Sequence, residues 1–376
     1  MTSIESQWNL DPNLIYLNHA AVSPWPACTV NAVQRFAEEN ARVGSLHYPR
    51  WLKTEAELRE KCCRLINANH TDDIALLKNT SEGLSIIAYG LDWNHGDNIV
   101  SSDEEFPSNR IIWESLKNRG VDFKQVNLLS SESPEQALIN AIDQHTRLLS
   151  ISSVQYATGL KIDLNTLGKY CRENNIIFVV DAIQSIGAHT IDVQACMADF
   201  VIADGHKWMM AAEGLALFYC SPQAKDRLKL NQFGWHMVEQ MGDFDNKNWQ
   251  IAKSARRFEC GSPNMLGVHA LNASLGLIEQ VGMEKIESKI KQNSEFLFEE
   301  INNNHKLNLV TNTDANRYAG IVSFFPQKIE SKVLFEHLTQ QGVFAALRGG
   351  NIRFSPHYYT PRDRLKQAIE LIKKFT

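Results

Sequence analysis

The stretch "IIFVVDAIQ", Ile176 to Gln184, decides the fold. Its first five residues are apolar without the alternation of a half-exposed strand, which is typical of a central strand covered by helices on both faces. Asp181 ends the apolar run, so we expect it at the carboxyl end of the sheet, where open α/β sheets bind their ligands. Gln184 follows three residues later. The stretch therefore predicts a buried parallel sheet with polar side chains gathered at one edge.

Short apolar runs alternate with helical patterns on both sides of this strand, from about residue 72 to residue 219. This alternation is typical of a series of βαβ units. Strands are expected in the segments "IALLK", "NIVSS", "VDFKQVNL", "RLLSISSV", "IIFVVDA", "DFVIA" and "LALFYC". We therefore predict an α/β protein with a mainly parallel, seven-stranded sheet.

The C-terminal part has a different pattern. Amphipathic helices are expected at Leu266 to Gln280, Met283 to Asn303, Ile329 to Gln341 and in the final "PRDRLKQAIELIKKF", with strands in "GIVSFF" and "NIRFS". We therefore predict a smaller α+β domain over residues 256–376, next to a large α/β domain over residues 26–255. Residues 1–25 are too few to fold alone and are expected to pack between the two domains.

The composition is that of an ordinary globular protein. Its 38 basic and 43 acidic residues give a net charge of -5, and no lysine- or arginine-rich block could follow a phosphate backbone, so we expect no nucleic-acid partner. We expect no membrane partner either, because the N-terminus lacks the features of a signal peptide and no apolar stretch could span a bilayer. The seven cysteines form no C-x-x-C pair and no zinc pattern, which predicts no metal site and a cytoplasmic location.

Lys207 leaves the next apolar strand, in "DFVIADGHKW". A buried amine is suited to form a Schiff base with a carbonyl compound, and a carboxylate such as Asp181 keeps a pyridine nitrogen protonated. Gln184 is suited to donate a hydrogen bond to the phenolic oxygen of the same ring. Alone, an aspartate at a strand end is more often a turn former, and a loop lysine is more often solvated. Their combination predicts pyridoxal phosphate chemistry.

Two further segments suit the rest of such a cofactor. Thr80 and Ser81 precede a helical run, where hydroxyls and free backbone N–H groups bind anions. The alternative is a plain capping box formed by Asn79 and Glu82. Phe106 follows a strand and has a flat side chain that could stack on a ring, although a core position is the alternative.

Arg348 and Arg353, in "LRGGNIRFSPHYY", suit the substrate. A guanidinium binds a carboxylate bidentately and so fixes the orientation of an amino acid. The alternative is that at least one of these arginines is a surface ion-pair partner.

The segments "VDAIQSIGAHTIDVQACMADFVIADGHKW", "RFECGSPN", "NTSEG" and "IRFSPHYY" resemble the signatures of class V aminotransferase-fold pyridoxal phosphate enzymes. This group includes cysteine desulfurases, selenocysteine lyases, kynureninases and isopenicillin-N-epimerase-like proteins. The resemblance extends from "YLNHAAVSP" to the last helix. It implies the aspartate aminotransferase-like fold, fold type I, and a homodimer with shared active sites.

The resemblance also implies roles for the matching residues. Lys207 would carry the Schiff base, and Asp181 would face the pyridinium nitrogen. The other implied cofactor positions are Thr80, Ser81, Phe106, Gln184 and His206, with Ser262 reaching the phosphate from the neighbouring subunit. The implied substrate positions are Asn18, His19, Ala20 and Arg353, to which the chemistry of the chain adds Arg348.

Two departures from the cysteine desulfurases bear on the reaction. Those enzymes carry a histidine above the ring, where this chain has Phe106. They also carry a persulfide-forming cysteine on a loop before the carboxylate-binding arginine. The segment "LRGGNIRFS" has no cysteine and is too short for such a loop, so we do not expect sulfur transfer through an enzyme cysteine.

We therefore predict an enzyme that acts on an amino acid as an aminotransferase or a related lyase. The alternatives are a selenocysteine lyase or cysteine desulfurase-like enzyme, an amino-acid epimerase, and a non-catalytic protein that only binds pyridoxal phosphate. A nucleotide-dependent enzyme would also fit the sheet pattern. Its phosphate loop is missing, because neither G-x-G-x-x-G nor G-x-x-x-x-G-K-[ST] is present.

Overall fold

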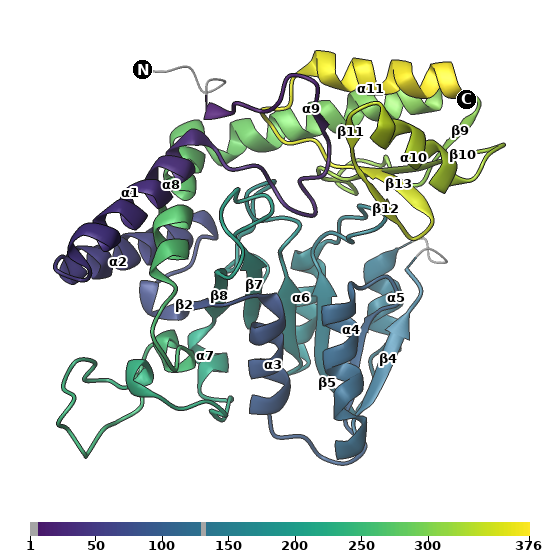
Figure 1. The fold of residues 1–376 in the computed structure, drawn as a ribbon. Helices are drawn as coiled ribbons and strands as arrows, with labels where there is room; N and C mark the ends of the chain where they lie inside the picture. The colour runs from purple at the N-terminus through teal and green to yellow at the C-terminus, as the bar shows by residue number, and fades with distance from the viewer. Residues whose placement is uncertain (1–6, 129–132) are drawn as a thin grey trace.

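The computed structural model describes residues 7–128 and 133–376, and Figure 1 shows their fold. A seven-stranded sheet lies at its centre, in the order β2-β8-β7-β6-β5-β3-β4. The strands are β2 (Ile74–Leu77), β3 (Asn98–Ser102), β4 (Asp122–Val126), β5 (Thr146–Ser152), β6 (Ile177–Asp181), β7 (Phe200–Asp204) and β8 (Ala216–Cys220). β8 runs antiparallel to both of its neighbours, β2 and β7, and the other adjacent strands of this sheet are parallel. The predicted seven-stranded, mainly parallel sheet is confirmed.

The lack of alternation in β6 has a simple cause. All five of its residues are buried. Phe178 and Val180 belong to the apolar core on one face of the sheet. Ile177 and Val179 belong to a second core on the opposite face. Since both faces of the strand are covered, both sets of side chains must be apolar.

Helices surround this sheet. They are α1 (Ala27–Val43), α2 (Tyr48–Leu65), α3 (Thr80–Gly90), α4 (Pro107–Glu114), α5 (Pro134–Ala141), α6 (Leu164–Glu173), α7 (Pro222–Lys225) and α8 (Met265–Val281). The 3₁₀ turns η2 (Thr71–Asp73), η3 (Ser115–Arg119), η4 (Trp235–Met237) and η5 (Ala255–Phe258) lie in the connections. Apolar residues of α3 and α4 belong to one core, and those of α2, α5, α6 and α8 belong to the other.

A smaller α+β part follows α8. Its antiparallel sheet has the order β12-β13-β10-β9. The elements are β9 (Leu307–Leu309), β10 (Val322–Pro326), β12 (Ala346–Arg348), β13 (Asn351–Phe354), α9 (Met283–Asn302), α10 (Ser331–Gln340) and α11 (Arg362–Phe375). They enclose a third apolar core. The domain boundary expected at residues 255 and 256 stays a prediction, and α8, which follows it, packs against α1 and α2.

The N-terminal segment connects the small sheet with the loop that carries Lys207. β1 (Ile15–Tyr16) pairs in parallel with β11 (Val343–Phe344). Further along, the N–H of Ser23 donates to the carbonyl of His206 at 2.8 Å. Over residues 7–128 and 133–376, no helix combines the length and the apolar character needed to cross a bilayer.

Candidate active site

The candidate site lies at the carboxyl ends of β6 and β7, which are neighbours in the sheet. Asp181 is the last residue of β6, and Lys207 follows β7 by three residues. The segment after Asp181 packs closely against Trp208 at Gly187. This residue has a φ of +94°, and a Cβ there would meet the carbonyl oxygen of Trp208 at 2.4 Å. Only glycine tolerates both conditions. The segment "QSIG" is thereby packed directly against the residue after Lys207.

Lys207 is half-buried at this edge. Burial lowers the pKa of its amine to about 8, Asp181 opposes that shift, and Arg353 adds to it. The Nζ atom lies 5.7 Å from the centre of the Phe106 ring. Phe106 is itself 43% exposed, so the core position considered from the sequence does not apply. The amine therefore has a pKa suited both to nucleophilic attack and to proton transfer near neutral pH.

Asp181 is fixed by two hydrogen bonds. Its Oδ1 accepts from the N–H of Ile183 at 2.9 Å, and its Oδ2 accepts from Nδ2 of Asn109 at 2.6 Å. Burial raises the pKa of this carboxyl, while its two hydrogen bonds and Lys207 lower it. Asn109, on α4, was missed in the sequence. It follows Phe106 by one turn, and no local pattern indicates that it faces a residue 72 positions away.

Glu105 is a second buried acid that the sequence did not reveal. It is 6% exposed and accepts hydrogen bonds from the N–H and Oγ of Ser152 and from Nε2 of Gln155. Burial raises its pKa to about 7, and the neighbouring Asp181 contributes to the rise. Glu105 thus connects the segment after β3 to the end of β5.

Gln184 has a fixed amide. Its Oε1 accepts from Nε1 of Trp208 at 2.9 Å, and its Nε2 donates to the carbonyl of Ala20 at 3.0 Å. An amide NH₂ group carries two hydrogens, so one donor remains for another partner. This is the donor that a phenolic oxygen on the ring of a cofactor requires.

The start of α3 is capped by protein side chains. The N–H of Glu82 donates to Oδ1 of Asn79, and the N–H of Lys78 donates to Oε2 of Glu82. The capping pattern that the sequence offered as an alternative is therefore present. The N–H and Oγ1 of Thr80 donate to Oδ1 of Asp204, at 2.6 and 3.0 Å. Ser81 is exposed.

His206 adds an unused donor beside this helix start. Its Nδ1 lies 3.6 Å from Oδ2 of Asp204 and is buried without a hydrogen-bond partner in the described part of the chain. Burial, with a contribution from Lys207, lowers its pKa to about 4, so the ring is neutral at pH 7. This atom is therefore free to bind a ligand beside the helix start.

Arg353 is a buried cation without an acidic partner among residues 7–128 and 133–376. Its Nη1 donates to the carbonyl of Tyr156 at 2.7 Å, its Nη2 lies 3.4 Å from Oδ1 of Asn18, and its Nε has no partner. Burial, followed by repulsion from Arg348, lowers its pKa to about 9. Since an uncompensated buried charge is strongly unfavourable, Arg353 and Arg348 together are suited to bind an anion.

The N-terminal positions Asn18, His19 and Ala20 are only partly available to a substrate. Asn18 faces Arg353, and the carbonyl of Ala20 faces Gln184. His19 is fully buried, with Nδ1 2.7 Å from the carbonyl of Ser355 and Nε2 2.7 Å from the hydroxyl of Tyr359. Both ring nitrogens are occupied, so the expected substrate contact of His19 is not supported. The side chain instead holds the segment against the small part.

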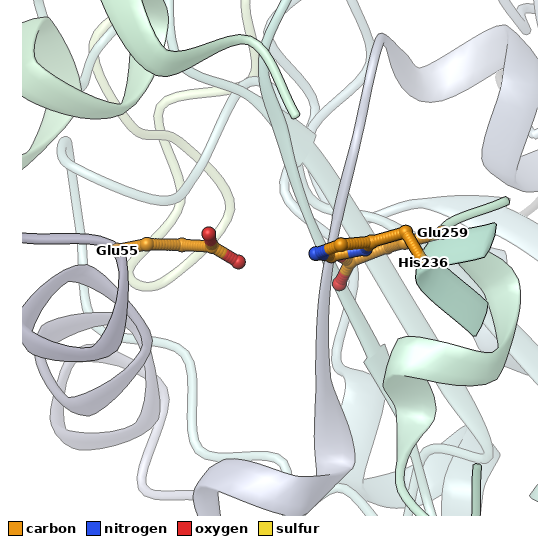
Figure 2. A group of neighbouring side chains, drawn as sticks. All are labelled: Glu55, His236 and Glu259. Atoms are coloured by element: carbon orange, nitrogen blue, oxygen red, sulfur yellow. The ribbon is translucent and has the colours of Figure 1, made fainter. Parts of the chain in front are cut away.

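Ser262, the remaining predicted residue, is exposed between η5 and α8. A buried group of charges fixes the segment before it. Figure 2 shows Glu55 of α2 facing His236 and Glu259. Arg59 donates to both carboxylate oxygens of Glu259 at 2.7 Å and to Glu55 at 2.5 Å.

Glu55, His236 and Glu259 are of residue types that can hold a metal ion. Arg59, however, already donates to both carboxylates, so these oxygens have a partner within the protein. Glu259 is also tied to the sheet, because its Oε1 accepts from the N–H of Leu76. We therefore interpret the group of Arg59, Glu55 and Glu259 as a structural anchor.

The connection before Arg353 is a tight hairpin. Arg348 pairs with Asn351, so only Gly349 and Gly350 lie in the turn, with φ values of +54° and +79°. Such a two-residue turn with left-handed dihedrals matches the twist of the strands that it joins. The prediction that this segment is too short to carry a cysteine loop is confirmed.

The side chains at this edge fit pyridoxal phosphate. Lys207 offers an amine for its aldehyde, Asp181 offers a buried carboxylate for its ring nitrogen, and Gln184 offers a free N–H for its phenolic oxygen. Phe106 is exposed beside Lys207, where it can stack on a ring. His206 offers its unused Nδ1 to the phosphate.

Comparisons with known proteins agree with this fit. A probable cysteine desulfurase of Methanothermobacter thermautotrophicus is 28% identical over 382 residues, which cover 96% of this chain and 94% of its own length. The cystine C-S lyase C-DES, in complex with its reaction product cysteine persulfide, superposes with a TM-score of 0.89 at 22% identity, over 96% of this chain and 97% of that one. A C-DES variant with glycine covalently linked to the PLP cofactor gives a TM-score of 0.88 at 22% identity, over 96% of each chain.

The expected fold type I and the expected pyridoxal phosphate-dependent enzyme of the transferase or lyase kind are thereby confirmed. The site residues named from the sequence stay predictions. The family described as Aminotransferase class-V matches residues 15–358. Because this match spans most of its length, the chain belongs to the Aminotransferase class-V family.

Proposed function

We propose that the protein is a lyase that eliminates a sulfur group from Cβ of a cysteine-type amino acid and releases the sulfur in a free product. The observation that carries this proposal is the two-residue hairpin between β12 and β13. It leaves no place for a cysteine that would accept sulfur in front of Arg353. The similarity to cysteine desulfurases and to a cystine C-S lyase supports a sulfur-containing substrate.

Arg353 binds the substrate carboxylate in this proposal. Its Nε lacks a protein acceptor among the described residues, and Arg348 adds a second positive charge. Asn18 contacts Arg353, and the carbonyl of Ala20 accepts from Gln184. A substrate held by its carboxylate presents its Cα–H bond in one orientation only, which places that bond for proton removal.

Lys207 removes the Cα proton at its Nζ atom. Pyridoxal phosphate, when bound, supplies an aldehyde for the amino group and a ring that accepts electrons. The electron pair of the Cα–H bond forms a Cα–Cβ double bond, and the sulfur leaves Cβ with both electrons of the broken bond. Hydrolysis then gives pyruvate and ammonia. Asp181 would hold the protonated ring nitrogen of the cofactor, and Phe106 would stack on the ring.

The test is a product analysis. The purified enzyme is supplied with PLP and given L-cystine, L-cysteine or L-selenocysteine, each with and without a keto acid, and the products are identified by mass. We expect pyruvate and ammonia in equal amounts with a persulfide or another free sulfur product. Release of alanine with sulfide or selenide, or transfer of the amino group to the keto acid, would contradict the proposal.

We also propose a homodimer. Residues 239–250 form a loop outside the body of the protein, at the lower left of Figure 1. This loop and the segment before it expose Phe233 by 62%, Phe244 by 80% and Trp249 by 51%. Exposed aromatic clusters of this kind mark interfaces, and a second copy would also bring Ser262 to the phosphate. The cytoplasmic location stays a prediction.

A further inference from the structure

We propose that Asp204 makes cofactor binding proton-linked, because its carboxylate holds the donors of Thr80 that the phosphate of the cofactor needs. The phosphate then binds tightly only when Asp204 is neutral or has released Thr80. This inference rests on the proposed placement of the phosphate at the start of α3. It concerns a residue to which the sequence assigned no role.

The Asp204 carboxylate and the proposed phosphate compete for the same donors. Asp204 Oδ1 accepts from both the N–H and the Oγ1 of Thr80. Its side chain is 12% exposed and lies beside the unused Nδ1 of His206. A phosphate seated between Thr80 and His206 would lie against this carboxylate, in a region where water screens charge poorly.

The surrounding charges do not remove the conflict. Asp181, at the end of β6, repels the Asp204 carboxylate, and Lys207 attracts it. His206 is neutral at pH 7. On the side of α3, Lys78 and Glu82 lie 3.4 Å apart and neutralise each other.

Asp204 is also already poised to take up a proton. Burial raises its pKa to about 6, even though the hydrogen bonds from Thr80 lower it. A phosphate dianion placed nearby would raise the pKa further, so a proton would enter with the cofactor. Affinity for a phosphorylated ligand should therefore fall as the pH rises above about 6.

The probe is pyridoxine 5′-phosphate, which lacks the aldehyde and therefore binds without reacting with Lys207. Its dissociation constant is measured by calorimetry from pH 5.5 to 8.5 for the wild type, Asp204→Asn and Asp204→Ser, in two buffers of different ionisation enthalpy. The asparagine variant keeps an acceptor for Thr80 without the charge, whereas the serine variant releases Thr80. We expect both variants to bind at least about tenfold more tightly than the wild type at pH 8.5.

The proton count separates Asp204 from the phosphate itself, whose second pKa is about 6 in every case. We expect the wild type to take up more protons per ligand at pH 7.5 than either variant. Pyridoxine without phosphate serves as the control and should bind equally to all three proteins. Equal or weaker binding of the phosphorylated probe by both variants, or the same proton uptake in all three, would overturn the inference. Neither measurement depends on catalysis, so a negative result here would leave the proposed reaction unaffected.

Discussion

Burial shapes the chemistry of Lys207. Its pKa of about 8 means that the neutral amine, which is the nucleophile, becomes the major form as the pH rises through about 8. We therefore predict that, with PLP saturating at every pH, the rate of PLP attachment to the apoenzyme rises with pH and levels off above that value. Stopped-flow absorbance from pH 6 to 10 measures this rate.

The neighbours of Lys207 give two controls of opposite sign. Asp181 raises its pKa and Arg353 lowers it. Asp181→Asn should therefore move the midpoint of the attachment rate to lower pH, and Arg353→Met should move it to higher pH. A wild-type midpoint near 10, as for a solvated lysine, would contradict the lowered pKa of Lys207.

Arg353 lacks a carboxylate partner among the described residues, so its interaction with substrate should be visible in KM. Removing a charge-assisted hydrogen bond costs about 1.5–3 kcal/mol. We predict that Arg353→Met raises KM about ten- to hundredfold, whereas Arg348→Met has a smaller effect because Arg348 is half-buried. Steady-state kinetics of pyruvate release test this. An unchanged KM in the Arg353 variant would exclude the proposed role.

Among the elements, η5 and the segment that follows it depend on a buried ion pair. Arg59 is 13% exposed and Glu259 is 4% exposed. Removing one partner of such a pair leaves a buried charge and destabilises a protein by about 3–5 kcal/mol. We predict this loss for Arg59→Met in urea unfolding followed by tryptophan fluorescence.

The matched control is the surface pair Arg110 and Glu114, whose side chains are 43% and 44% exposed. Exposed pairs contribute about 1 kcal/mol or less, so Arg110→Met should change the free energy of unfolding by no more than that. Equal losses in the two variants would mean that the pair of Arg59 and Glu259 does not anchor the segment.

The elements were predictable where the signal is local. The unbroken apolar run of β6 indicated burial on both faces, and the shortness of "LRGGNIRFS" indicated that no cysteine loop precedes Arg353. The contact between Thr80 and Asp204 joins residues 124 positions apart, and the contact between Arg59 and Glu259 joins residues 200 positions apart. No local periodicity encodes such contacts. The sequence therefore indicated the candidate residues at the ends of β6 and β7 but not the contact of Asp204 with Thr80.

At the scale of the whole molecule, the proposed dimer makes each site depend on both chains. Lys207 would come from one subunit and Ser262 from its partner. Lys207→Ala and Ser262→Asp should each be inactive alone. When the two variants are unfolded and refolded together in equal amounts, about half of the dimers should be mixed, and each of these should contain one intact site.

We therefore predict recovery of activity in about a quarter of the sites of the co-refolded sample. Size-exclusion chromatography with light scattering gives the mass of the assembly in parallel. A monomeric mass, or no recovery although mixed dimers form, would contradict shared sites.

The central claim is that the amine of Lys207 forms the covalent link with pyridoxal phosphate. Borohydride reduction of the PLP-loaded protein, followed by proteolysis and mass spectrometry, tests it most directly. We predict a pyridoxyl adduct on the peptide that contains Gly205, His206 and Lys207, with its fragments placing the label on Lys207. A label on another lysine, or a protein that binds PLP and yields no labelled peptide after reduction, would contradict the account.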